Sequence, residues 1–304
     1  MNWFGVMPAM TTAFDAQMRV DHAFMAKHAR WMIDNGCTGI VLPGSLGEGA
    51  TLSAGEKIEM LKNVSAAIKG APAVAAISAL STGEAVDLAK AAADVGCSGL
   101  MVLPPYVYRS DWREMKAHVT AVFRATPLPC MLYNNPIAYG TDFLPEQIAE
   151  LAGEYSNFEA VKESSADVRR VTAIRALLDD RLKVFVGVDD GIVEAIGVGA
   201  TGWIAGLVNA FPAESVALFN LALEQKHEEA FALYRWFLPL LRMDTVVKFV
   251  QLIKLVQEEI GVGNARVRPP RLELVGKELE EAKATLAEAL KTRPTVREAA
   301  FAIA

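Results

Sequence analysis

The chain has 304 residues, of which 52% are hydrophobic, and its formal net charge is −6. A chain of this length and apolar content can bury a large core, in one large domain or two smaller ones. The basic residues are scattered, apart from a small group at Arg266, Arg268 and Arg271, which argues against a nucleic-acid partner. No apolar run approaches the roughly 20 residues of a membrane span, and no basic segment precedes an apolar one at the N-terminus. We therefore expect a cytoplasmic protein with no membrane partner.

Short apolar runs typical of β-strands recur along the chain as far as Ile204. Longer amphipathic segments separate them, and two of these begin with the capping-box pattern Ser-x-x-Glu, at Ser53 and Ser81. The runs do not alternate with polar residues, which is typical of strands in a parallel sheet covered on both faces. We expect eight strands, near Val6–Met10, Gly39–Leu42, Ala73–Ile77, Gly99–Leu103, Cys130–Tyr133, Phe158–Val161, Lys183–Val186 and Gly202–Ile204.

The joint between a helix and the next strand is repeated in the sequence. The segments 34–43 (DNGCTGIVLP), 94–104 (DVGCSGLMVLP) and 197–206 (GVGATGWIAG) each place a helix-stopping glycine before a strand. The alternation of strands and helices predicts an α/β fold, a (β/α)8 TIM barrel with additional C-terminal helices, with a doubly wound open sheet as the alternative. We expect the barrel in residues 1–210, its last helix continuing beyond, and a helical region packed on the barrel in residues 211–304.

Polar groups stand at the expected carboxyl ends of several strands. Lys162 follows the sixth strand, Tyr133 ends the fifth, and a glycine-rich loop, GSLGEG at 44–49, follows the second. The segment PPYVYRSD at 104–111 follows the fourth. Because the βα loops of a barrel gather at this end and hold its active site, these groups should share one mouth.

A lysine at a desolvated strand end can form a Schiff base. Burial disfavours the ammonium form, so the pKa of the amine falls and the free amine can attack a carbonyl carbon. The protonated imine withdraws electrons, so bonds one carbon further out can break or form, while a tyrosine carries protons. The backbone N–H groups of the loop at 44–49 can hold a carboxylate. These groups predict a small 2-oxo acid as substrate, with the covalent imine on Lys162 in place of a cofactor.

Ordinary structural roles are the alternative for each of these residues. Lys162 could be a solvated loop residue, or the partner of Glu163 or Glu48 in an ion pair, and Tyr133 could be a packing residue. The glycine-rich loop lacks the Gly-Lys-Ser/Thr ending of a phosphate loop.

The cysteines and histidines predict neither a disulfide nor a metal site. The cysteines are widely spaced and are expected to be small buried residues, and the histidines lie in helical segments without ligand spacing. They are Cys37, Cys97, Cys130, His22, His28, His118 and His227.

Four motifs occur along the chain: Gly-Ser-x-Gly-Glu at 44–48, Tyr-Asn-x-Pro at 133–136, Val-Lys-Glu at 161–163 and Gly-x-Asp-Asp at 187–190. In this order and at these separations they resemble the dihydrodipicolinate synthase / N-acetylneuraminate lyase family of class I, Schiff-base-forming aldolases, and the likeness covers nearly the whole chain. The resemblance implies a (β/α)8 barrel followed by C-terminal helices, assembly usually as a homotetramer, and catalysis through an imine on a lysine.

The resemblance also assigns roles by position. Lys162 would be the imine lysine and Tyr133 the proton-transfer tyrosine. Ser45 would relay protons or bind the substrate carboxylate together with the backbone N–H of Leu46. Ile204 would line the pocket beside the imine.

Two departures from that family bear on the substrate. Dihydrodipicolinate synthases carry Thr-Thr where this chain has Ser45-Leu46, and an arginine where it has Ala138. Without that arginine a second substrate carboxylate would be buried uncompensated, which disfavours condensation of pyruvate with aspartate semialdehyde. Arg109, in the loop after the fourth strand, is the nearest alternative cation.

The loop after the fourth strand departs from the family as well. The family's additional tyrosine aligns here on Val107. Tyr106 or Tyr108 would replace it if the loop shifts, and both are candidate substrate-binding residues together with Arg109. In the glycine-rich loop, Glu48 would brace the backbone.

The favoured activity is that of a 1-pyrroline-4-hydroxy-2-carboxylate deaminase. Its substrate has one carboxylate and a compact ring, which suits a mouth made apolar by Leu46 and Trp203. Lys162 would attack the C=N bond, the imine would drive loss of the 4-hydroxyl, and hydrolysis would release 2-oxoglutarate semialdehyde. The alternatives are a pyruvate-producing aldolase such as 4-hydroxy-2-oxoglutarate aldolase, with Arg109 on the second carboxylate, and a dihydrodipicolinate synthase-like condensation. A non-catalytic barrel that binds oxo acids is the alternative of another class, but it would be expected to lose Lys162 or Tyr133.

Overall fold

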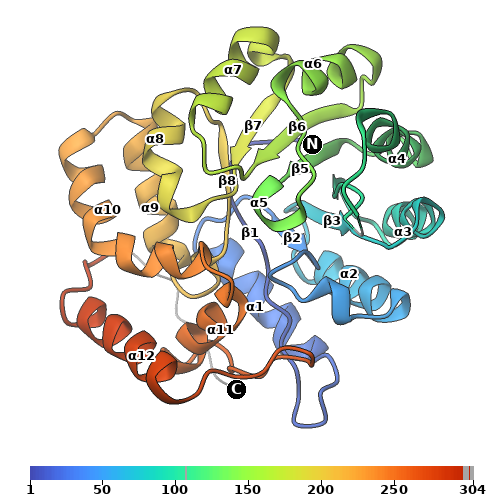
Figure 1. The fold of residues 1–304 in the computed structure, drawn as a ribbon. Helices are drawn as coiled ribbons and strands as arrows, with labels where there is room; N and C mark the ends of the chain where they lie inside the picture. Colours follow the sequence, from blue (N-terminus) through green and yellow to red (C-terminus); the bar gives the residue numbers. More distant parts are fainter. Residues whose placement is uncertain (107, 297–300, 302–304) are drawn as a thin grey trace.

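The computed structural model describes residues 1–106, 108–296 and 301, so Val107, on which the family's additional tyrosine aligns, lies outside the described residues. The strands are β1 Gly5–Pro8, β2 Ile40–Leu42, β3 Ala73–Ile77, β4 Gly99–Val102, β5 Cys130–Asn134, β6 Phe158–Glu163, β7 Lys183–Val186 and β8 Gly202–Ala205. They pair in parallel in the order β1-β8-β7-β6-β5-β4-β3-β2, and a parallel bridge between Ala9 and Val41 joins the two ends of this order (Figure 1). The predicted (β/α)8 barrel is confirmed.

Two strands differ from their predicted bounds in a way that matters for the site. β6 continues through Lys162 and Glu163, and β5 through Asn134, so Lys162 lies within its strand and not after it. In the parallel register, Tyr133 is the Cα partner of Lys162. Since paired residues at one level of a sheet point to the same face, this register places the phenol beside the amine.

Helices follow the strands and cover the outside of the barrel (Figure 1). They are α1 His22–Asp34, α2 Ala54–Ala67, α3 Thr82–Asp94, α4 Trp112–Ala125, α6 Pro145–Glu154, α7 Arg169–Leu178, α8 Ile192–Gly197 and α9 Pro212–Leu223. The short helix α5 Pro136–Tyr139 follows β5 and lies over the strand ends, inside this ring of helices (Figure 1). The predicted capping box of Ser53 and Glu56 is complete at the start of α2. At the start of α3, the Ser81 hydroxyl accepts from the backbone N–H of Glu84. Both helices therefore begin where the sequence pattern predicts.

The repeated joint is confirmed in the backbone. Gly36, Gly96 and Gly199 each end a helix with a positive φ, at 95°, 90° and 105°. The next residue returns its N–H to a carbonyl of the last helical turn, as when Cys37 donates to Met32 at 3.1 Å. A left-handed residue is needed to make this turn, and glycine adopts that conformation without strain.

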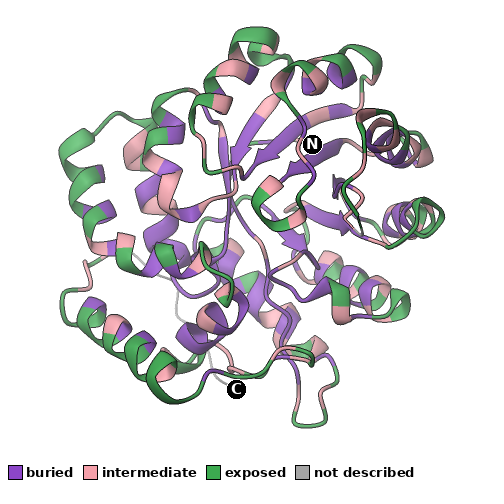
Figure 2. Cartoon of the chain, viewed as in Figure 1, coloured by how far each residue is buried: buried purple, intermediate pink, exposed green. Residues whose placement is uncertain are grey.

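The apolar residues form two layers, one inside the barrel and one between the strands and the helices. Figure 2 shows the strands and parts of the surrounding helices as buried. Side chains alternate along each strand, so Ile204 of β8 points into the interior and its neighbour Trp203 points outward. The three cysteines are buried and unpaired, as predicted. The interior layer comprises Trp3, Met7, Val41, Val74, Ala76, Met101, Leu103, Met131, Tyr133, Ala160, Phe185 and Ile204.

Three further helices follow α9: α10 His227–Leu241, α11 Phe249–Glu259 and α12 Gly276–Lys291. A break in the helical region separates α10 from α11, and the short 3₁₀ turn η5 Arg242–Asp244 lies in it. α10 contacts α9 and α12, while α11 contacts α12. The predicted boundary at residue 210 falls just before α9. The division of the chain into a barrel and a C-terminal helical region stays a prediction. None of the helices in the described part of the chain combines the length and apolar character that a membrane span requires.

Candidate active site

Lys162 lies buried near the carboxyl end of β6. It is 5% exposed, and its Nζ lies 4.3 Å from the centre of the Tyr133 ring. Gly187, just beyond β7, leaves room for it, because a Cβ there would lie 2.2 Å from Lys162 Cε and 2.0 Å from Ser164 Oγ. Burial lowers the pKa of the Lys162 amine to about 8. Much more free amine is therefore present near neutral pH than for an exposed lysine.

Neither Glu163 nor Glu48 forms an ion pair with Lys162. Glu163 accepts from Asn134 Nδ2 at 3.0 Å and from a backbone N–H at 2.7 Å. Glu48 forms a buried ion pair with Lys254, 3.0 Å from Nζ to Oε1. Both carboxylates are thus engaged elsewhere, and Lys162 forms no ion pair within the described residues. The explanation of Lys162 as half of a structural ion pair is wrong.

Two carboxylates beyond β7 and β8 set the charge around Lys162. Asp189 is fully buried and accepts from the Trp203 indole N–H at 3.1 Å and from two backbone N–H groups at 2.9 and 3.0 Å. Asp244 of η5 is partly exposed, and a Cβ on Gly206 would lie 2.1 Å from its Oδ1. Burial raises the pKa of Asp189 to about 6 and raises the pKa of Asp244 well above its usual value. Both carboxylates favour the ammonium form of Lys162 and partly offset the effect of burial on its pKa.

Tyr133 is oriented by its own motif. Asn135 Nδ2 donates to the Tyr133 hydroxyl at 3.0 Å, and the hydroxyls of Ser45 and Ser164 lie beside it. Burial raises the pKa of the phenol to about 12, so it is protonated at neutral pH. A protonated phenol beside a free amine is the pair that general acid catalysis of imine formation requires.

Ser45 lies in the loop after β2, and its hydroxyl is hydrogen-bonded to the hydroxyl of Tyr139. The backbone N–H groups of Ser45 and Leu46 donate to no acceptor within the described residues, so both can hold an anion. The Leu46 side chain is 3% exposed and packs between the strands and the helices. Any contact of Leu46 with a substrate would thus be made by its backbone.

The loop after β4 brings only some of its predicted residues to the mouth. The Tyr106 ring lies 5.7 Å from the Tyr139 ring, centre to centre. Arg109 is exposed but lies against Gly140, since its Nε would be 3.4 Å from a Cβ there. Tyr108 is 55% exposed, and its hydroxyl interacts with the first turn of α4, away from Lys162.

The eighth strand places one of its two predicted residues inside the barrel. Ile204 is 1% exposed and belongs to the same interior layer as Tyr133. Trp203 is fully buried on the outer face, where its indole donates to Asp189. The prediction that Trp203 makes the pocket apolar is wrong, because neighbouring residues of a strand face opposite ways.

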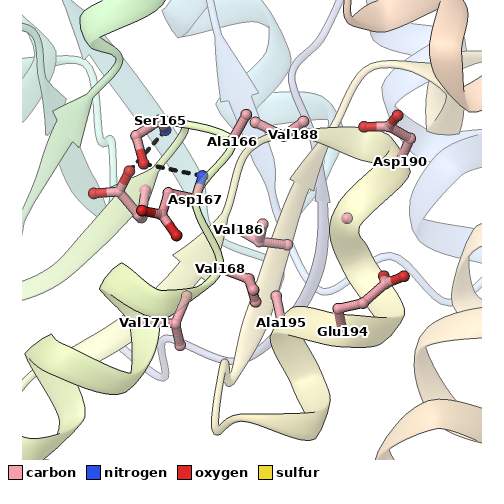
Figure 3. Close-up of a pocket in the computed structure, with 12 residues that line it drawn as sticks. Ser165, Ala166, Asp167, Val168, Val171, Val186, Val188, Asp190, Glu194 and Ala195 are labelled. Atoms are coloured by element: carbon pink, nitrogen blue, oxygen red, sulfur yellow. Dashed lines mark hydrogen bonds between the residues drawn. The ribbon is translucent and has the colours of Figure 1, made fainter.

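A cavity of about 260 Å³ lies outside the barrel, between the segments that follow β6 and β7 (Figure 3). Glu163, Asp167, Asp190 and Glu194 contribute carboxylates to it, while Lys162 does not line it. Since side chains alternate along β6, Glu163 faces this outer cavity and Lys162 faces the interior. In the part of the chain that the structure describes, no three His, Cys, Asp or Glu side chains are grouped to hold a metal ion.

Tyr139, Asp189 and Asp244 join the site although the sequence analysis gave them no role. Asp189 carried a signal, because it belongs to the Gly-x-Asp-Asp motif. Tyr139 stands three residues after the end of Tyr-Asn-x-Pro, where one helical turn returns it toward the mouth. Asp244 carried no signal, since it lies in a segment with a helical pattern.

A buried lysine, a phenol and a loop with two unengaged backbone N–H groups lie at the carboxyl end of this (β/α)8 barrel, the end at which barrel enzymes carry their active sites. Residues 2–289 match the Dihydrodipicolinate synthetase family. The chain belongs to this family and is a lyase of it, as the ordered motifs predicted.

The relatives cover most of the chain. It is 32% identical over 302 residues to the 4-hydroxy-tetrahydrodipicolinate synthase of Desulforudis audaxviator, covering 97% of each. It is 36% identical over 221 residues to that of Natronomonas pharaonis, covering 72% of this chain and 75% of the relative. The solved structure of the enzyme from Methylacidiphilum fumariolicum SolV superposes with a TM-score of 0.91 at 28% identity, over 95% of this chain and 97% of that one.

Proposed function

We propose that Lys162 forms a covalent imine with a small 2-oxo acid or cyclic imine and that no separate cofactor takes part. The observation that carries the proposal is the state of the Lys162 amine. It is buried, forms no ion pair in the described part of the chain, and lies beside the protonated Tyr133 with its pKa lowered to about 8. A solvated structural lysine would have none of these properties.

Other residues take supporting roles in this proposal. The N–H groups of Ser45 and Leu46 bind the substrate carboxylate, because they point to no acceptor within the described residues. Tyr133 transfers protons at the imine. Ile204 forms part of the apolar interior below it.

The favoured substrate is 1-pyrroline-4-hydroxy-2-carboxylate. Ala138 stands exposed on α5 and offers no cation to a second carboxylate. The carboxylate of Asp189, which favours the ammonium form of Lys162, would repel a second substrate carboxylate on that side. Asp244 is partly exposed, so its carboxyl group can hydrogen-bond the ring nitrogen or the 4-hydroxyl of a cyclic imine.

The reaction balances with the uptake of one water molecule. The Lys162 amine adds to C2 of the ring, the ring C–N bond at C2 breaks, and the new imine links C2 to the lysine. C3 then loses a proton and the 4-hydroxyl leaves as water, which forms a C3=C4 double bond. Proton shifts from C5 and the amine nitrogen to C3 and C4 convert this double bond into a C5=N imine. Hydrolysis at C2 and at C5 frees Lys162 and releases ammonia with 2-oxoglutarate semialdehyde.

Two alternative activities each have an observation in their favour. Arg109 lies against Gly140 at the end of α5, close to the place of the family's arginine, which supports cleavage of the dicarboxylate 4-hydroxy-2-oxoglutarate. The relatives are named 4-hydroxy-tetrahydrodipicolinate synthases, which supports condensation of pyruvate with aspartate semialdehyde.

Trapping with borohydride tests the imine. Pyruvate plus borohydride is expected to add the mass of one reduced adduct at Lys162, and Lys162→Ala is expected to remain unmodified while keeping its fold. An adduct on Lys183 or no adduct under saturating pyruvate would overturn the proposal.

A substrate panel tests the choice of reaction. Incubation with 1-pyrroline-4-hydroxy-2-carboxylate is expected to release ammonia and 2-oxoglutarate semialdehyde. Pyruvate and glyoxylate from 4-hydroxy-2-oxoglutarate, without deamination, would establish the aldolase and predict that Arg109→Ala abolishes cleavage. Condensation product would establish the synthase. Imine formation without turnover of any of these substrates would favour the non-catalytic barrel.

A further inference from the structure

A second, smaller cavity lies between α11 and α12, apart from Lys162. The two helices contact each other on the outside of the barrel (Figure 1), and the segment that joins them also lines the cavity. Its volume of about 100 Å³ is several times the roughly 10–15 Å³ that one water molecule requires. The cavity can therefore hold a small molecule, and none of the residues that line it belongs to the active site.

Gln251 of α11 lines this cavity with an amide group that lacks a partner. The side chain is 9% exposed, and its Oε1 is buried and accepts no hydrogen bond within the described residues. A buried amide oxygen without a donor is costly, because it has lost its bonds to water and gained none in return. A ligand that brings a donor into the cavity would remove this cost.

Two carboxylates give the cavity a negative charge. The Glu258 carboxylate accepts from the backbone N–H of Ala265 at 3.2 Å, and neither it nor the exposed Glu273 pairs with a cation in the described part of the chain. The Lys283 ammonium also lines the cavity, but Glu259 Oε1 lies 2.8 Å from its Nζ and balances its charge. The remaining charge therefore attracts a cation and repels an anion.

Apolar side chains narrow the choice of cation. Leu255, Leu274 and Leu279 border the same cavity and belong to one small hydrophobic cluster. An inorganic ion would leave these leucines facing water, whereas a short alkyl group would be buried against them. An ammonium group supplies up to three N–H donors, as the Gln251 oxygen and the carboxylates require. A short primary alkylammonium ion combines both properties.

We propose that the cavity between α11 and α12 binds a short primary alkylammonium ion. Its N–H groups donate to Gln251 Oε1 and to the carboxylates of Glu258 and Glu273, while its alkyl group packs on the leucines. Binding involves no covalent change. The site does not use the imine at Lys162, so failure of either proposal leaves the other standing.

The same helix holds two loops at the mouth of the barrel. On the adjoining face of α11, Lys254 Nζ donates to the carbonyl of Thr12 at 2.8 Å and pairs with Glu48. Gln257 Oε1 accepts from the Thr11 hydroxyl at 2.9 Å. A ligand that fixes α11 against α12 therefore also fixes the residues that hold the loops after β1 and β2, and should stabilise the folded protein.

Ethylammonium chloride, without pyruvate, tests the site. NMR saturation transfer from the protein to the ethyl protons should report binding, and the midpoint temperature of unfolding should rise more than in sodium chloride at the same concentration. Tetramethylammonium carries the same charge but has no N–H group, so it should show neither effect. Lys162→Ala should bind ethylammonium as the parent protein does, because the cavity is separate from the active site.

Substitutions locate the bound ion. Gln251→Leu keeps the size of the side chain and removes the acceptor, so the affinity for ethylammonium should fall roughly tenfold or more, as for loss of a hydrogen bond to a charged group. Glu273→Gln should weaken binding by roughly twofold to fivefold, as for an exposed charge. Glu280→Gln is its matched control, since Glu280 is exposed on α12 and does not line the cavity, and it should leave the affinity unchanged.

Leu279→Phe narrows the cavity from the side of α12 and should abolish binding, which keeps the test decisive if Gln251→Leu does not fold. The absence of saturation transfer in the parent protein would show that the cavity holds water only and would overturn the proposal. An equal response to tetramethylammonium, or unchanged affinity in both Gln251→Leu and Leu279→Phe, would overturn it as well. Binding that is lost in Lys162→Ala would place the amine in the active site and not in this cavity.

Discussion

At the scale of single residues, the proposed imine makes the first step depend on the protonation state of Lys162. Its amine must be free to attack, and burial places its pKa at about 8. Below this pH the rate of adduct formation with pyruvate should rise about tenfold per pH unit, and above it the rate should level off. Tyr133 stays protonated over this range because its pKa is raised to about 12.

Initial rates of trapping between pH 6 and pH 10 check this prediction, with Nα-acetyl-lysine as a reference for the reagents. A rate that keeps rising to roughly pH 10.4, as for an unperturbed lysine, would show that the amine is solvated in solution.

The Tyr133 hydroxyl is separable from its ring. Tyr133→Phe keeps the ring over which Lys162 Nζ lies at 4.3 Å and removes only the hydroxyl. Turnover should fall by roughly two to four powers of ten, as for loss of a general acid–base group, while the unfolding transition should change little. Steady-state kinetics measures the turnover rate. Tyr155→Phe, which removes a phenol hydrogen-bonded to Arg124 outside the site, is the control and should keep normal turnover. Near-normal turnover would mean that Tyr133 serves only in packing.

At the scale of elements, the end of β7 is shaped for the lysine of β6. A Cβ at Gly187 would lie 2.2 Å from Lys162 Cε, so Gly187→Ala must displace the lysine side chain. We expect adduct yield to drop sharply and the free energy of unfolding to fall by about 1–3 kcal/mol through overpacking. Urea unfolding and trapping measure the two effects.

Gly191→Ala is the control for that change. A Cβ at Gly191 meets nothing within 4 Å, so both stability and adduct yield should match the parent protein. Equal behaviour of the two variants would contradict the assigned role of Gly187.

A buried ion pair joins α11 to the loop that carries Ser45. Lys254 Nζ lies 3.0 Å from Glu48 Oε1, and the other Glu48 oxygen accepts from the backbone N–H of Arg268 at 2.8 Å. Glu48→Gln leaves the Lys254 ammonium buried without a counter-charge, which should cost about 3–5 kcal/mol of unfolding free energy. The double variant Glu48→Gln/Lys254→Met should recover part of this loss.

The surface pair of Lys283 and Glu259 is the control for the buried one. Its atoms are 2.8 Å apart, but both side chains are partly exposed. Glu259→Gln should therefore change stability by less than about 1 kcal/mol. Denaturant titration measures the free energy of unfolding of each variant and so compares the two ion pairs. An equally small effect for Glu48→Gln would show that other contacts hold the loop that carries Ser45.

At the scale of the whole molecule, we propose that the chain assembles as a homotetramer. Support comes from large apolar side chains that stand exposed, among them Leu80 at 69%, Ile137 at 72% and Val247 at 97%. These residues belong to separate segments of the chain, and a homotetramer would cover apolar side chains of this kind at its interfaces. Light scattering at micromolar concentration should give four times the chain mass of 32.8 kDa. A mass of one chain would rule the tetramer out.

Local pattern was sufficient for the architecture and for the residue types of the site. The apolar runs located all eight strands, and the glycines at 36, 96 and 199 marked the turns into three of them. These features depend on near neighbours in the chain: on the periodicity of burial and on the backbone freedom of glycine. The ordered motifs likewise named Lys162, Tyr133 and Ser45 without any coordinates.

Contacts between distant segments were decided only by the tertiary structure. The register of β5 against β6 set Tyr133 beside Lys162, and a break between α10 and α11 contains Asp244, whose carboxylate acts on Lys162. Trp203 lies outside the pocket because its side chain points to the outer face of its strand. None of this is encoded in local periodicity, because the path of a loop and the pairing of strands are set by packing of the whole barrel. The sequence by itself therefore determined the fold and the chemical groups, while their geometry depended on the complete barrel.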